Sequence, residues 1–120
     1  MRGKRIDPYG VTLYVGFTGF ERDELCEKFD LKFEDDCAGA VYISTHVRTG
    51  KTCVTVLIDG QYARSRGTAF LVDTIAHEST HAAGTILKHV GQKHDGRTEA
   101  FAYLVGFIAG HIYKEWEKRA

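Results

Sequence analysis

The sequence lacks a net charge, since its 120 residues include 16 Lys and Arg side chains and 16 Asp and Glu side chains. Without a global field of one sign, the chain has no general attraction for nucleic acid or for an anionic membrane surface. We therefore expect neither nucleic acid nor a membrane as a partner.

Cysteines are few and irregularly spaced. Cys26, Cys37 and Cys53 are an odd number with no Cys-x-x-Cys pair, a pattern that fits neither a disulfide framework nor a thiolate zinc site. The N-terminus has no apolar run of the signal-peptide type. The longest apolar stretch, residues 100–109, is about half the length that spans a bilayer. These absences predict a cytoplasmic location.

Apolar periodicity predicts one α+β domain over residues 1–120, with a small antiparallel or mixed sheet, one backing helix and two long C-terminal helices. Alternation over residues 9–17 indicates a strand. The other expected elements follow in chain order: a helix over 19–29, a strand hairpin over 41–48 and 51–59, a loop over 60–67, and helices over 69–89 and 97–117.

Local signals support several of these boundaries. Thr18 and Glu21 have the spacing of a capping box, which predicts a helix start. Gly50 is the turn residue of the expected hairpin. Thr68 is the expected N-cap of the first long helix. The basic N-terminus, including Lys4, is expected to be a solvated tail.

The first long helix contains the sequence HESTH, which has the form His-Glu-x-x-His. Residues four apart in an α-helix lie on one face, so His77 and His81 are expected to project side by side and to bind one metal ion. Glu78 lies roughly 100° around the helix from His77. It is therefore better placed to act as a general base on water than as a metal ligand.

A catalytic zinc ion usually has three protein ligands and one open position. The metzincin pattern fails because residue 87 is leucine, and His89 is about 12 Å along the helix from His81. His94 and Asp95, in the expected turn, remain candidates together with Glu99. We rank Glu99 first because it begins a second helix that can pack against the first.

The HESTH motif, followed by a downstream helix with the sequence EAFAY from residue 99, resembles the gluzincin branch of the zincin metallopeptidases. The resemblance extends over about residues 68–110. It implies a zincin-like fold whose two long helices hold one zinc ion per chain through His77, His81 and Glu99. The implied activity is peptide-bond hydrolysis with Glu78 as general base.

The resemblance also implies roles for residues around the zinc ion. Tyr103 stands where many gluzincins have a supporting aspartate. Independently of the resemblance, Asp73 lies one helical turn before His77, where it can orient a ligand imidazole or act as a helix-start aspartate favoured by the helix dipole. Candidates for stabilising the oxyanion of the reaction are Tyr62, His94 and Arg97.

Two functions from different classes follow from this interpretation. The first is a zinc metallopeptidase whose peptide or protein substrate binds as an added strand along an exposed sheet edge. The alternative is a zinc-stabilised, non-catalytic protein that acts by binding another protein.

Overall fold

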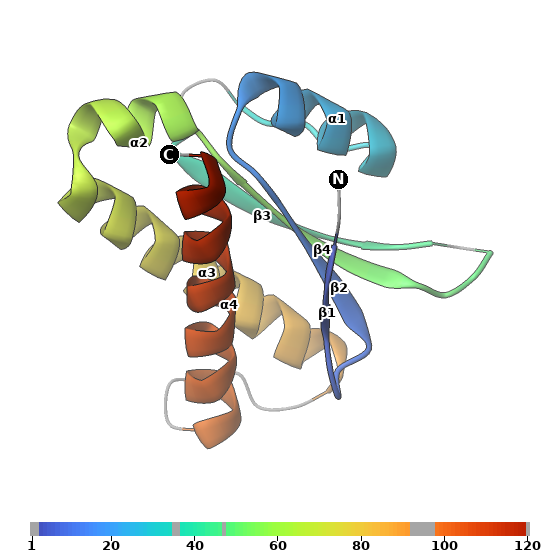
Figure 1. The fold of residues 1–120 in the computed structure, drawn as a ribbon. Helices are drawn as coiled ribbons and strands as arrows, with labels where there is room; N and C mark the ends of the chain where they lie inside the picture. The colour runs from blue at the N-terminus through green and yellow to red at the C-terminus, as the bar shows by residue number, and fades with distance from the viewer. Residues whose placement is uncertain (1–2, 35–36, 47, 92–97, 120) are drawn as a thin grey trace.

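The computed structural model describes residues 3–34, 37–46, 48–91 and 98–119. In this part of the chain, four strands and four helices form an α+β fold (Figure 1). The elements are β1 (Lys4–Ile6), β2 (Val11–Gly16), α1 (Gly19–Phe29), β3 (Gly39–Thr45), β4 (Thr52–Ile58), α2 (Gly60–Arg66), α3 (Thr68–His89) and α4 (Glu99–Arg119). The predicted α+β class is confirmed.

The four strands form one mixed sheet in the order β1-β2-β4-β3. The central pair, β2 and β4, is parallel, with Leu13 opposite Val54. Both outer pairs are antiparallel, so the predicted hairpin of β3 and β4 is confirmed, with Gly50 at φ 70° in its turn. This topology places β3 at one edge of the sheet, next to the strand that precedes α2 and α3.

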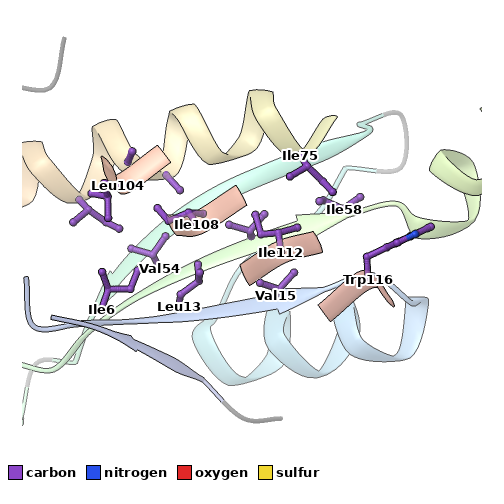
Figure 2. Close-up of a cluster of buried hydrophobic side chains, with 14 of the residues drawn as sticks. Ile6, Leu13, Val15, Val54, Ile58, Ile75, Leu104, Ile108, Ile112 and Trp116 are labelled. Carbon is purple, nitrogen blue, oxygen red and sulfur yellow. The ribbon is translucent and has the colours of Figure 1, made fainter. Parts of the chain in front are cut away.

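Helices cover both faces of the sheet. Val15 of β2 and Val54 of β4 point into a core shared with α3 and α4, whose contribution includes Ile75 and Ile108 (Figure 2). The opposite face lies against α1, where the Tyr14 and Phe29 rings are 5.2 Å apart. Every residue of β4 is buried, because this central strand has helices on both sides.

The start of α1 agrees with its sequence signal. The Thr18 hydroxyl accepts a hydrogen bond from the Glu21 amide, and the Glu21 carboxylate accepts one from the Thr18 amide. The predicted capping box is therefore present.

Three local predictions are wrong. Residues 60–67 are not a loop, because the Asp59 carboxylate caps the short helix α2 by accepting from the Tyr62 amide. The N-cap of α3 is Gly67, and Thr68 is already helical. Lys4 belongs to strand β1, because pairing with Leu13 gives the N-terminal backbone regular hydrogen-bond partners and buries Ile6.

Among the residues that the structure describes, no helix is both long and apolar enough to cross a bilayer. This agrees with the sequence estimate for residues 100–109.

Candidate functional site

The His77 and His81 side chains converge on the exposed side of α3. Their Nε2 atoms are 3.2 Å apart and their rings meet at an interplanar angle of 73°. Two nitrogen ligands at the usual zinc distance, separated by a tetrahedral angle, are ~3.3 Å apart. The pair therefore has the spacing of two ligands of one ion.

Glu78, the next residue after His77, is only 6% exposed. It lies against Gly39 at the start of β3. A Cβ atom built on Gly39 would be 2.8 Å from Oε2 of Glu78 and 2.9 Å from its Cγ. The absence of a side chain at Gly39 is what lets this carboxyl group enter the space between α3 and the edge strand.

Burial raises the pKa of Glu78, and the nearby His77 and His81 imidazoles lower it by a smaller amount. The net rise has a simple cause, since removal of a carboxylate from water disfavours its charged form. A carboxyl group with a raised pKa can both take up and release a proton closer to neutral pH, as a general base requires.

A cavity of about 330 Å³ adjoins His81. It is lined by Gly84 and Lys88 of α3 and by Phe101 of α4, among others. Helix α4 thus provides one wall of the space beside the exposed imidazole, and Gly84 leaves room next to it.

The remaining residues predicted from the sequence do not gather around this pair. Glu99, in the first turn of α4, is exposed, as is Asp73. Tyr103 is 69% exposed, and Tyr62 packs edge-on against Phe70 with ring centroids 5.3 Å apart. In the described part of the chain, neither Asp73 nor Tyr103 has a hydrogen bond to the histidines. His94, Asp95 and Arg97 lie outside the described residues.

Within residues 3–34, 37–46, 48–91 and 98–119, no group of three or more His, Cys, Asp or Glu side chains is placed to hold a metal ion. His77 and His81 are a pair of donors, and Glu99 does not complete them there as a three-ligand group.

Comparisons of the chain with protein-family models, curated proteins and solved structures find no match. The resemblance to the gluzincin branch of the zincins is therefore wrong, since neither a related family nor an assembled ligand set supports it. The physical reason is that His-Glu-x-x-His fixes only one turn of helix, whereas a third ligand must arrive through tertiary packing.

Sequence reasoning missed Gly39, the residue that gives Glu78 its space. A signal was present, because glycine near a strand end often marks a close approach by another group. The sequence could not identify the group, since Gly39 and Glu78 meet only when α3 packs across the sheet.

Proposed function

We propose that this protein is a metal-dependent hydrolase of peptide bonds, with His77 and His81 as two ligands of a zinc ion and Glu78 as general base. The observation that carries the proposal is that the Nε2 atoms of His77 and His81 are 3.2 Å apart and that Glu78, the residue after His77, is buried. This donor pair fits two corners of a tetrahedral zinc site.

When bound, zinc would supply a Lewis acid for the scissile carbonyl and lower the pKa of water. The protein's part is proton transfer at the Glu78 carboxyl group. Glu78 takes a proton from the attacking water and passes it to the leaving amine.

The position of β3 supports an extended peptide as substrate. Within the described chain β3 pairs only with β4, so its other edge has backbone groups available for an added strand. The strand begins at Gly39, against the Glu78 carboxyl group. A peptide paired along β3 would therefore run past the proposed general base.

The test is hydrolysis of an unstructured polypeptide by the zinc-loaded protein, with Glu78→Gln as the decisive variant. We expect Glu78→Gln to bind zinc as the wild type does and to lose about a hundredfold or more in rate. Glu117→Gln, an exposed change on α4, is the matched control and should retain full activity.

Zinc affinity, measured by competition with a chromophoric chelator, tests the ligands separately. His77→Ala should weaken binding by at least about a hundredfold, because a single imidazole remains. His89→Ala, on the same helix but outside the pair, should change it little. The same measurement on Glu99→Ala and His94→Ala tests whether either residue adds a further ligand.

Two results would contradict the proposal. The first is equal zinc affinity in the wild type and His77→Ala, which would show that His77 is not a zinc ligand. The second result is that the wild type binds zinc but hydrolyses no polypeptide, and that Glu78→Gln does not differ from it in either property. This result would instead favour a zinc-stabilised protein that acts by docking on another protein.

A further inference from the structure

A second candidate site lies where the C-terminal end of α4 meets α2 and the start of α1 (Figure 1). A cavity of about 330 Å³ at this junction is lined by three arginines from three helices, Arg22 of α1, Arg64 of α2 and Arg119 of α4. Phe17 and Trp116 also line it. None of these residues belongs to the site proposed above.

Each guanidinium group is held in place by contacts with other residues of the protein. Nη1 of Arg22 donates to the carbonyl oxygens of Phe17 at 2.5 Å and Ile58 at 3.1 Å. The Arg64 guanidinium lies 5.0 Å over the Trp116 ring. Nε and Nη2 of Arg119 donate to the Glu21 carboxylate at 2.8 and 2.6 Å. Because these arginine side chains are already ordered, a ligand that binds them causes a smaller loss of side-chain conformational entropy.

The cavity has an excess of positive charge. Arg119 is paired with Glu21, but among the described residues neither Arg22 nor Arg64 forms an ion pair with a carboxylate. Arg119 is paired with both Glu21 and Glu115, so the charges of Arg22 and Arg64, about two positive charges, remain for a ligand. Among the described residues, no hydrogen bond uses any of the five N–H donors of Arg64, and Arg22 uses only donors on Nη1.

We propose that this cavity binds the phosphate group of a small molecule. A phosphate monoester carries a charge of about −1.5 to −2 at pH 7, which matches the excess charge of the cavity. Its oxygens accept paired hydrogen bonds from the planar guanidinium fork. Phe17 and Trp116 form an aromatic wall that excludes water from one side of the anion and strengthens these hydrogen bonds.

The chain contains one tryptophan, Trp116, so its fluorescence reports on this cavity without interference. The experiment titrates the full-length protein with inorganic phosphate and with ribose 5-phosphate at constant ionic strength. We expect a saturable fluorescence change with a Kd on the order of a millimolar or tighter. Tighter binding of ribose 5-phosphate than of inorganic phosphate would identify a phosphorylated metabolite as the ligand, and the reverse order the free ion.

Arg64→Gln is the decisive variant, because in the part of the chain that the structure describes Arg64 has no hydrogen bond to the backbone, so its loss should leave the fold intact. Since the substitution also changes the surroundings of Trp116, affinity is measured in parallel by calorimetry. We expect Arg64→Gln to weaken phosphate binding by about tenfold or more, as for the loss of a charge-assisted hydrogen bond. Arg66→Gln is the matched control, since Arg66 is on the same helix but stacks near Phe70, outside the cavity.

Three outcomes would overturn the proposal. They are the absence of saturable binding by either phosphate compound, an equal loss of affinity in Arg64→Gln and Arg66→Gln, and binding of acetate as tight as that of phosphate. The last result would show a general anion effect without selectivity for a doubly charged phosphate. None of them bears on zinc binding or peptide hydrolysis, so the two proposals fail separately.

Discussion

Two residues on neighbouring strands, Gly39 of β3 and Thr55 of β4, affect the protein in different ways. Gly39 leaves the space into which the Glu78 carboxyl group packs. The Thr55 hydroxyl, on the central strand, is buried without a hydrogen-bond partner among the described residues. The first feature positions a functional group, whereas the second carries only a cost in stability, so substitutions at the two positions should have different effects.

Gly39→Ala should reduce hydrolysis by about tenfold, because the new Cβ atom displaces the Glu78 carboxyl group from its position beside the edge strand. The change in the free energy of unfolding should be small, since alanine also restricts the unfolded chain. Steady-state kinetics and urea denaturation measure the two effects. A stable variant with wild-type kinetics would show that the close approach of Gly39 does not position Glu78.

Thr55→Val should stabilise the protein by about 1 kcal/mol, because it replaces a buried, unpaired hydroxyl with a methyl group of similar shape. Thermal and urea unfolding give the difference. Thr45→Val is a useful control, since the Thr45 hydroxyl is paired with that of Thr52 at 3.1 Å and its removal should not stabilise. A loss of stability in Thr55→Val would mean that the hydroxyl is hydrogen-bonded in solution.

At the level of helices and strands, one carboxylate joins two ends of the chain. Glu21 closes the capping box of α1 and binds Arg119 in the last turn of α4, 98 residues away. Burial alone would raise the pKa of Glu21. The hydrogen bonds from Arg119, Thr18 and Phe17 outweigh it and lower the pKa to about 2. The ionised form therefore links the start of α1 to the end of α4.

This linkage predicts a pH dependence. Because the pKa of Glu21 is lower in the folded chain, its contribution is fully present above the ordinary value of 4.5 and is lost as the pH falls through 2. Glu21→Gln should cost about 1 to 2 kcal/mol at pH 7, after allowance for solvent screening. The difference from wild type should shrink as the pH falls from 4.5 toward 2. Urea titrations across this range measure it, with exposed Glu117→Gln as control, and a difference independent of pH would contradict it.

For the molecule as a whole, the two candidate sites involve different residues. Helices α3 and α4 share the main core with one face of the sheet, while α1 covers the other face (Figures 1 and 2). The candidate hydrolytic site involves α3 and the β3 edge, whereas the arginine-lined cavity involves α1, α2 and the end of α4. Ligands of the two sites can therefore be tested one at a time.

Zinc should stabilise the folded chain, because an ion bound only by the native state adds to the free energy of unfolding. At a free zinc concentration one hundred times the Kd, the gain is about 2.7 kcal/mol, or roughly 10 °C in Tm for a domain of this size. Differential scanning calorimetry with zinc and with chelator tests this. An equal shift in His77→Ala would assign the zinc effect to other residues.

The features that the sequence predicted correctly depend on residues close together in the chain. The capping box of Thr18 and Glu21, the hairpin turn at Gly50, and the shared face of His77 and His81 are each set within a few residues by backbone geometry. Short-range signals were not always sufficient, because α2 was predicted to be a loop although Asp59 was present to cap it.

The features that the sequence did not predict depend on packing between distant segments. The parallel pairing of β2 with β4, the contact of Gly39 with Glu78, and the position of Glu99 relative to the histidine pair follow from how α3 and α4 cross the sheet. Neither apolar periodicity nor helix caps predict such a contact between distant segments. The free energy that stabilises the contact comes from the burial of many side chains together. The HESTH turn could therefore be predicted to present two imidazoles on one face, but the groups that surround it required the folded molecule.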